Sequence, residues 1–375
     1  MDILEQTKSS AAKTVRSDVY RLIEPYVFKP VSLELPVDKN DVVVRPTFGS
    51  ICAADLRYYT GNRRPEALRK KLPMALIHEA IGEVVDPNGH DLQPGQRVVL
   101  VPNVPGYLYD PVRFPSPKAC CRACGESGVG ENHCANCRFL SSGHDGFLMS
   151  RVSHTRACVV PIPDGVPDRL ATMSELASVA YNAVKRVQLP ENAIFAIFGD
   201  GPMGYITAVV IQKMFDLPPE RLFVVGKDDE KLAHYDFATR VNLTADPGLD
   251  ALPPFDFGFE CVGGAQSMKA IDDAIRIAQP GAEIFLMGVS ETPIPLNTRD
   301  VLEKGLAIRG VSRSPRQDYP VVLEMMRDPV FKTRLDRVIA PVQPEFQNID
   351  SLLALFNLAT RKTLWGKIVF GFNLS

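Results

Sequence analysis

The strongest constraint on the fold of this chain is a glycine-rich turn between a strand-like run and a helix-like run. AIFAIF (193–198) is entirely apolar, GDGPMG (199–204) follows it, and YITAVVIQKMF (205–215) is helix-like. The turn spells G-x-G-x-x-G in the strand–turn–helix context of a dinucleotide-binding motif. Glycines let the backbone approach a pyrophosphate, and the helix N-terminus offers free N–H groups to it. The residues expected to bind the dinucleotide are Gly199, Gly201, Pro202, Met203 and Gly204.

The sequence around the turn supports this interpretation over that of a glycine-rich turn without a ligand. From about residue 170, apolar strand-like runs alternate with helix-like segments. Such alternation predicts βαβ units with a parallel sheet, so we expect a Rossmann domain over residues 172–313. The other expected strands are 222–225, 255–263, 282–288 and 306–311, and the expected helices are 228–238 and 267–278.

The rest of the chain is rich in short strand-like runs separated by Pro and Gly, a pattern that predicts a β-rich domain. These runs are 41–46, 77–85, 97–102 and, at the end of the chain, 366–372. We therefore expect an α/β protein in which the β-rich catalytic domain comprises residues 1–171 and 314–375. The first residues are polar without a clear apolar period, so 1–19 are interpreted as a loose N-terminal extension.

Charge and hydropathy exclude several classes of protein. The 375 residues include 42 Lys and Arg against 44 Asp and Glu, a net charge of −2, which argues against nucleic-acid binding by bulk charge. No apolar run has the length of a membrane span, and MDILEQTKSS does not resemble a secretory signal. We expect a cytoplasmic protein that binds neither nucleic acid nor membrane.

The end of the second expected Rossmann strand favours one dinucleotide over the other. NAD-binding proteins usually place Asp or Glu there, about 20 residues beyond the turn, to hold the ribose hydroxyls. This chain has Gly226 and Lys227 instead, and a cation attracts the 2′-phosphate that NADP carries. We expect NADPH/NADP+ as the cofactor. In the alternative, Asp228 or Asp229 reaches back to the ribose of NAD.

Five of the eight cysteines lie in one short stretch, whereas disulfide scaffolds spread their cysteines through a small secreted fold. Two C-x2-C pairs in this stretch have the spacing of a closed, structural Zn2+ site. The expected ligands are Cys121, Cys124, Cys134 and Cys137. Cys120 is a substitute ligand or a spare thiol.

A second group of zinc-competent residues comprises Cys52 and the adjacent His78 and Glu79. Spacing alone does not assign them, because isolated Cys and His residues are commonly core residues. A family resemblance does. The chain resembles the zinc-dependent medium-chain dehydrogenase/reductase superfamily in the following segments: Cys52-x-x-Asp55, His78-Glu79-x-x-Gly82-x-Val84, the cysteine-rich stretch, GDGPMG, ECVGG (260–264) and WGKIV (365–369).

Within that superfamily, the chain is similar to the ribulose-5-phosphate reductases, the ribitol-5-phosphate dehydrogenases of CDP-ribitol synthesis. The segments that carry this similarity are SICAADLRYYTGNR (50–63), KLPMALIHEAIGEVV (71–85), SSGHDGF (141–147), GDGPMGYITA (199–208) and VLEKGLAIRGVSRS (301–314). The resemblance implies a GroES-like fold for the β-rich domain. It also implies zinc-assisted, NADPH-dependent reduction of D-ribulose 5-phosphate to D-ribitol 5-phosphate, which feeds teichoic acid or capsule synthesis.

The resemblance further implies the roles of individual residues. Cys52, His78 and Glu79 occupy the positions of the catalytic zinc ligands. Glu175 matches a glutamate that ligates zinc directly or through water, and Asp55 matches the acid that orients the histidine.

Two positions depart from the family pattern. Ala54 stands where a Ser or Thr often relays the proton, so water, Glu79, Glu175 or the substrate's own hydroxyls must supply it. Ser127 stands where the third cysteine of the structural zinc site is usual, which is why Cys137 is expected to complete that set.

A sugar-phosphate substrate requires cationic side chains, and a basic run follows Cys52. Arg57 and Arg63 are the expected phosphate ligands, because a guanidinium can bind two oxygens, with Tyr59 as an added donor. The alternative is a solvated surface run. His144 either contacts the substrate or caps a turn.

Two other functions are compatible with parts of this pattern. One is an NAD-linked, sorbitol-type polyol dehydrogenase acting on an unphosphorylated sugar alcohol, which Lys227 and the basic run disfavour. The other is a non-catalytic relative, which should have lost zinc ligands that this chain retains. A homodimer is expected from the family, with a ribitol-5-phosphate cytidylyltransferase as a functional partner.

Overall fold

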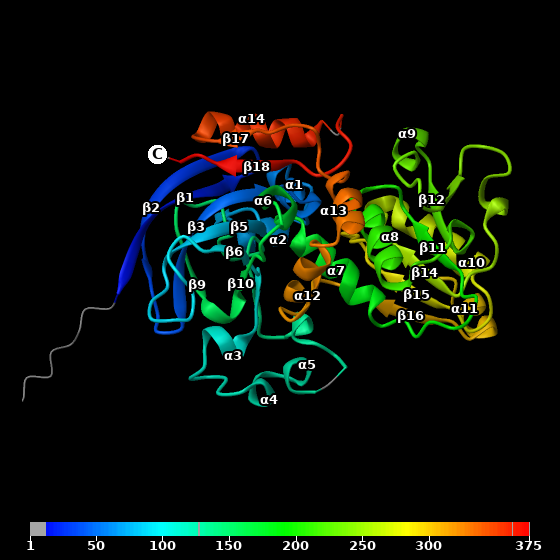
Figure 1. The fold of residues 1–375 in the computed structure, drawn as a ribbon, viewed down its shortest axis with the longest axis horizontal. Helices are drawn as coiled ribbons and strands as arrows, with labels where there is room; N and C mark the ends of the chain where they lie inside the picture. The colour runs from blue at the N-terminus through cyan, green and yellow to red at the C-terminus, as the bar shows by residue number, and fades with distance from the viewer. Residues whose placement is uncertain (1–12, 127, 362, 375) are drawn as a thin grey trace, which may run out of the picture.

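The computed structural model describes residues 13–126, 128–361 and 363–374. These residues form two domains side by side (Figure 1), a β-rich domain built from both ends of the chain and a parallel-sheet domain built from its middle. The expected α/β architecture is therefore confirmed. The strands of the parallel sheet, β11 to β16, lie between residues 195 and 310, inside the segment assigned to the Rossmann domain, and the exact boundary residues stay a prediction.

The β-rich domain centres on a sheet with the strand order β10-β6-β5-β3-β18-β17, in which β9 also pairs with β3. Its strands are β3 (Asp41–Ser50), β5 (Glu79–Asp86), β6 (Arg97–Leu100), β9 (Val152–Thr155), β10 (Val159–Pro161), β17 (Glu345–Phe346) and β18 (Val369–Phe372). Because β18 pairs antiparallel with β3, the last segment of the chain returns to the first domain, as the sequence predicts.

The N-terminal segment corrects one expectation. Strand β1 (Thr14–Glu24) pairs with β2 (Val27–Pro36) and with β4 (Met74–Ala75). The interpretation of residues 14–19 as a loose extension is therefore wrong. Ser17 and Val19 are buried while Arg16 and Asp18 are exposed, but a serine at a buried position conceals the two-residue apolar period in the sequence. Residues 1–12 of the expected extension lie outside the described residues.

The parallel-sheet domain has the strand order β13-β12-β11-β14-β15-β16. This is the order of a doubly wound dinucleotide-binding sheet, which reverses direction between its first and fourth strands. Its strands are β11 (Phe195–Phe198), β12 (Leu222–Gly226), β13 (Thr239–Asn242), β14 (Phe257–Glu260), β15 (Glu283–Leu286) and β16 (Ala307–Gly310). Its helices are α8 (Pro202–Phe215), α9 (Asp229–Leu232), α10 (Ser267–Ile277) and α11 (Thr298–Lys304).

Helix α9 is shorter than the helix expected over 228–238. Tyr235 and Phe237 are both buried, and both rings lie against Tyr205 of α8. Residues two apart in a helix point in nearly opposite directions, so a continuous helix could not bury both rings on one side. Core packing therefore ends the helix at Leu232.

Helices at the junction connect the two domains. α7 (Ser174–Val184) packs against α8 and against α12 (Asp318–Met325), and α13 (Pro329–Asp336) packs against α8. Elsewhere, α1 (Ala53–Tyr59) and α2 (Pro65–Lys71) follow β3, α6 (Asp168–Ala171) precedes α7, and α14 (Ile349–Thr360) covers the β-rich domain near the C-terminus (Figure 1).

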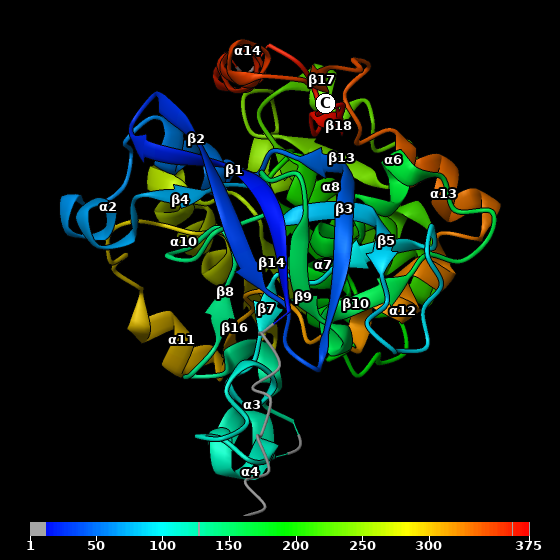
Figure 2. The ribbon, with the colours of Figure 1, turned by 90° about the vertical axis from the view of Figure 1, so that its left-hand side faces the viewer.

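The cysteine-rich segment forms a small lobe that extends away from the sheets (Figure 2). It contains α3 (Gly106–Tyr109), α4 (Pro117–Cys120) and α5 (Arg122–Gly125), and β7 (Asn103–Val104) pairs with β8 (Arg138–Phe139) at its base. None of the helices in the described residues is long and apolar enough to cross a membrane.

The core of the parallel sheet generates a stability prediction. Phe259 on β14 is fully buried and stacks on Phe285 with ring centroids 4.9 Å apart. Truncation leaves a cavity, so Phe259→Ala should lower the free energy of unfolding by about 3–5 kcal/mol. Leu302→Ala on α11, where the side chain is 80% exposed, is the matched control. Urea denaturation followed by circular dichroism measures both, and equal midpoints would contradict the assignment of Phe259 to the core.

Candidate active site and metal centres

Three expected zinc ligands converge where β3 and β5 lie side by side. Ser50 at the end of β3 is the cross-strand partner of Glu79 at the start of β5. Cys52 lies two residues after β3 and precedes α1, and His78 directly precedes β5. The donor atoms of Cys52, His78 and Glu79 lie within 4.8 Å of one another. Strand pairing therefore brings together two motifs that are distant in the sequence.

The chemistry and burial of this group fit a zinc ion. A thiolate, an imidazole and a carboxylate are all ligands that zinc accepts. His78 and Glu79 are buried, and Oε2 of Glu79 has no hydrogen-bond partner among the described residues. A buried carboxylate oxygen without a partner is costly, and a cation at this point would satisfy it.

Asp55 is fully buried on α1 and holds the group in place. Its Oδ1 accepts hydrogen bonds from the Ile77 N–H at 3.1 Å and the Ser141 hydroxyl at 2.7 Å, and its Oδ2 accepts one from the Cys52 N–H at 3.0 Å. Oδ1 also lies 3.6 Å from Nδ1 of His78. Burial opposes ionisation, but His78 and these hydrogen bonds outweigh it and lower the pKa of the Asp55 carboxyl. Asp55 is placed to orient His78.

Glu175 lies in the first turn of α7, buried beside the three converging residues but not within their group. Burial raises the pKa of its carboxyl to about 7, and the charges of His78 and Glu79 act on it in opposite directions. The helix thus brings a fourth titratable group to the domain junction.

Lys367 is a site residue that the sequence reasoning missed. Its side chain is buried, and Nζ donates a hydrogen bond to Oε1 of Glu79 at 2.7 Å. Burial opposes its protonation, but the Glu79 carboxylate outweighs this and raises the pKa of Lys367. The sequence signal that could have identified Lys367 was its place in WGKIV (365–369), one of the segments that carry the family resemblance.

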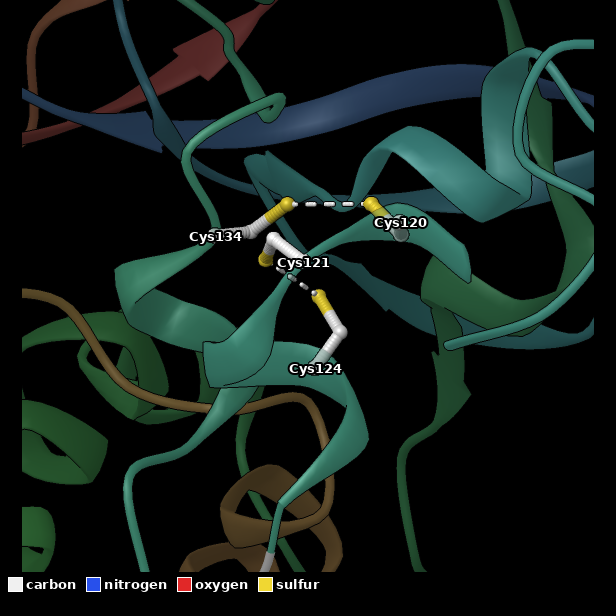
Figure 3. Close-up of side chains that lie close together, drawn as sticks. All are labelled: Cys120, Cys121, Cys124 and Cys134. Carbon is white, nitrogen blue, oxygen red and sulfur yellow. Dashed lines mark hydrogen bonds between the residues drawn. The ribbon is translucent and has the colours of Figure 1, made fainter. Parts of the chain in front are cut away.

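Four sulfur atoms converge in the cysteine-rich lobe (Figure 3). Those of Cys120, Cys121, Cys124 and Cys134 lie within 4.8 Å of one another, with the Cys120–Cys134 and Cys121–Cys124 pairs each 3.5 Å apart. Sulfurs in a disulfide are about 2.0 Å apart, whereas sulfurs around a tetrahedral zinc ion are about 3.8 Å apart. The four thiols therefore fit a closed zinc site.

The composition of this cluster corrects the expected set at one position. Cys120, which the sequence offers as a substitute ligand, lies in the cluster in place of Cys137. Cys137 directly precedes β8 and lies beside Arg313, whose guanidinium donates a hydrogen bond to its sulfur at 3.0 Å. Ser127 lies outside the described residues.

The glycine-rich turn lies at the C-terminal end of β11, where the strand order reverses. Gly199 has φ +124°, and an added Cβ would lie 3.1 Å from the Cys261 backbone. A Cβ on Gly204 would overlap the carbonyl of Gly199, whereas Gly201 faces open space. The turn is therefore closely packed at Gly199 and Gly204 but open at Gly201, as it must be for a pyrophosphate to approach the backbone. The remaining expected residues, at the start of α8, are Pro202 and Met203.

The end of β12 lies against the same turn. Oδ2 of Asp200 accepts hydrogen bonds from the N–H groups of Lys227 at 2.8 Å and Asp228 at 3.2 Å. A Cβ on Gly226 would lie 2.7 Å from the Asp200 side chain, so only glycine fits there. The Lys227 side chain is exposed at this edge of the sheet, where a cofactor ribose lies in this fold.

Asp228 and Asp229, the alternative ligands for the ribose of NAD, have other partners. Asp228 caps α9 by accepting hydrogen bonds from the N–H groups of Glu230 and Lys231. Asp229 accepts a hydrogen bond from the Asn242 side chain at 2.7 Å. This arrangement favours NADP over NAD.

Buried Glu260 is a further residue whose role was not foreseen. Its Oε1 accepts hydrogen bonds from the Val262 and Gly263 N–H groups, and its Oε2 accepts one from Gly288. It therefore shapes the loops at the ends of β14 and β15, next to the glycine-rich turn. Its place in ECVGG (260–264) was the available signal.

The expected phosphate ligands divide into two groups. Arg57 and Arg63 lie together and share Glu291 as an ionic partner. Tyr59 is a core residue instead: it is 1% exposed, and its hydroxyl donates to Asn357. The expectation for Tyr59 is therefore wrong, because the ring packs away from the arginines. His144 is exposed, and its carbonyl accepts the Ser141 N–H at 3.0 Å in a turn.

A β-rich domain with a Cys–His–Glu group, joined to a dinucleotide-binding sheet, defines a zinc-dependent medium-chain dehydrogenase/reductase. Residues 38–164 match the alcohol dehydrogenase GroES-like domain family, which confirms the GroES-like fold. The chain is 39% identical over 314 residues to ribulose-5-phosphate reductase 2 of Staphylococcus aureus, covering 83% of this chain and 86% of that one. It belongs to the ribulose-5-phosphate reductase family.

Two further relatives agree with this membership. The ribulose-5-phosphate reductase of Bacillus spizizenii is 36% identical over 358 residues, with 94% of this chain and 98% of that one covered. The crystal structure of S. aureus TarJ in complex with NADPH is 34% identical, has a TM-score of 0.77, and is matched over 96% of this chain and 99% of its own.

The cysteine cluster generates a prediction about metal content. Cys120→Ser should lose the zinc of this site because it removes one of four converging sulfurs, whereas Cys137→Ser should retain it. Metal analysis of the purified variants by mass spectrometry measures the zinc content. Retention of zinc in Cys120→Ser together with loss in Cys137→Ser would return Cys137 to the ligand set.

Proposed function

We propose that this protein reduces D-ribulose 5-phosphate to D-ribitol 5-phosphate with NADPH. The observation that carries the proposal is the convergence of Cys52, His78 and Glu79 beside a dinucleotide-binding sheet, in a chain related throughout to ribulose-5-phosphate reductases. The NADPH bound by TarJ and the placement of Lys227 support the choice of cofactor.

In this mechanism, Cys52, His78 and Glu79 would hold a zinc ion, and Glu175 lies beside these three residues. When bound, zinc polarises the substrate carbonyl at C2 and NADPH supplies the hydride. Asp55 fixes the orientation of His78, and Lys367 balances the charge of Glu79. Ala54 offers no hydroxyl, so the product oxygen receives its proton through water, Glu79, Glu175 or the substrate's own hydroxyls.

Several finer expectations belong to the same proposal. The protein forms a homodimer in the cytoplasm, and a ribitol-5-phosphate cytidylyltransferase consumes its product. These points stay predictions. The runner-up function, an NAD-linked dehydrogenase of an unphosphorylated polyol, is disfavoured because Asp228 and Asp229 are engaged in local hydrogen bonds.

The direct test follows NADPH absorbance with purified protein and D-ribulose 5-phosphate, with NADH and unphosphorylated ribulose in parallel. We expect rapid oxidation of NADPH, weak oxidation of NADH, and none in Cys52→Ala, because that variant lacks a zinc ligand. The Cys158→Ala variant, which removes a buried cysteine outside both metal groups, is the control. Full activity in Cys52→Ala would sink the catalytic-zinc assignment, and turnover with NADH alone would sink the choice of cofactor.

A second prediction concerns Lys227. Removing one charged contact to the 2′-phosphate costs about 1.5 kcal/mol, so Lys227→Ala should raise KM for NADPH about tenfold while KM for NADH changes little. Lys269→Ala, a 64% exposed lysine on α10, is the control. Steady-state kinetics with both cofactors provide the measurement, and equal changes for NADPH and NADH would contradict a 2′-phosphate contact.

A further inference from the structure

One carboxylate of the parallel-sheet domain pairs with two arginines of the β-rich domain. Glu291 lies between β15 and α11 of the parallel-sheet domain. Its Oε1 lies 2.7 Å from Nη1 of Arg63 and 3.3 Å from Nε of Arg57. Arg57 is on α1 and Arg63 follows that helix, so both belong to the β-rich domain.

The charges at this contact do not balance. Two guanidinium groups face a single carboxylate, and both side chains are largely shielded from water, at 25% exposed for Arg57 and 16% for Arg63. Burial and the neighbouring charge of Arg63 lower the pKa of Arg57. A phosphate monoester carries a charge of about −1.5 to −2 at neutral pH, which matches two cations better than one carboxylate does.

The hydrogen bonds at this contact are also incomplete. The Nε atoms of Arg57 and Arg63 are buried, and within the described ranges neither has a hydrogen-bond acceptor. Buried donors of this kind are normally satisfied. A phosphate group offers three acceptor oxygens and suits guanidinium donors.

A third cation lies near this contact, and Arg57 is close in sequence to the expected metal ligand Cys52. The Arg63 guanidinium lies 4.4 Å from the centre of the Tyr58 ring, and Lys71 donates a hydrogen bond to the Tyr58 hydroxyl at 3.0 Å. Arg57 lies five residues beyond Cys52, a rise of about 7.5 Å along a helix. This separation is comparable with the extent of a five-carbon sugar phosphate whose carbonyl lies near Cys52.

We propose that Glu291 occupies the phosphate subsite of the substrate, and that the phosphate monoester binds to Arg57 and Arg63 by displacing this carboxylate. The inference rests on the proposed function for the identity of the sugar phosphate. Glu291, which belongs to the parallel-sheet domain, competes with that phosphate for Arg57 and Arg63. Such a subsite would favour a phosphorylated ketose over a free one, because a free ketose carries no charge to displace Glu291.

The test compares Glu291→Gln with Glu283→Gln. Both glutamates have side chains that are 27% exposed and pair with an arginine at 2.7 Å, but Glu283 pairs with Arg309 within the parallel-sheet domain. Removing the competing charge should lower KM for D-ribulose 5-phosphate about three- to tenfold, lower Kd for inorganic phosphate similarly, and leave KM for NADPH unchanged. Glu283→Gln should match the wild-type protein. Arg63→Met should weaken both phosphate binding and substrate binding.

The outcomes separate this inference from the proposed function. Calorimetric titration with inorganic phosphate requires no turnover. Tighter phosphate binding in Glu291→Gln supports the subsite even if wild-type protein fails to reduce D-ribulose 5-phosphate. If wild-type protein reduces that substrate but both glutamine variants bind phosphate equally, the inference is overturned while the function stands. A fall in KM for NADPH instead would assign the arginines to the cofactor and would also overturn the inference.

Discussion

The buried carboxylate of Asp55 is the interaction on which the expected catalytic centre depends. It accepts hydrogen bonds from the backbone before α1, from the backbone before β5, and from Ser141 in a third segment. A buried charge is tolerated only when it is paired and hydrogen-bonded, and removing its partners costs several kcal/mol. Because these partners come from separate parts of the chain, the same bonds that satisfy Asp55 also fix Cys52 next to His78.

The two ends of the chain meet at the same centre. Strand β18 pairs with β3, and this pairing carries Lys367 into the interior, where it meets Glu79. A lysine buried beside a carboxylate stabilises the charged form of each partner. The return of the C-terminal segment to the first domain therefore supplies a charge that the site requires, besides closing the sheet.

Carboxylates of the parallel-sheet domain contribute to both expected binding sites. On the cofactor side, Asp200 draws the N–H groups of Lys227 and Asp228 toward the glycine-rich turn. On the substrate side, Glu291 reaches from the same domain to Arg57 and Arg63. The parallel-sheet domain thus supplies a carboxylate to each of these two sites, although the expected metal ligands Cys52, His78 and Glu79 belong to the β-rich domain.

The sequence by itself determined the features that depend on local pattern. The alternation of strands and helices, the glycines at 199 and 204, and the absence of an acid at the end of β12 all lie within short segments. Backbone geometry constrains such segments without reference to distant residues, so the parallel sheet and the dinucleotide turn could be predicted. The three converging ligands Cys52, His78 and Glu79 needed a family resemblance as well, because only the pairing of β3 with β5 brings them together.

Tertiary structure decided the points that depend on where side chains lie in space. The direction of the chain into β8 placed Cys137 against Arg313 and left the fourth sulfur position to Cys120. Packing against α14 and β2 made Tyr59 a core residue, and burial of two rings ended α9 early. Glu291 and Lys367 gave no local signal of their partners, since each pairs with residues more than 200 positions away. Spacing along a chain limits which groups can meet, but the packing of distant segments decides which of them do.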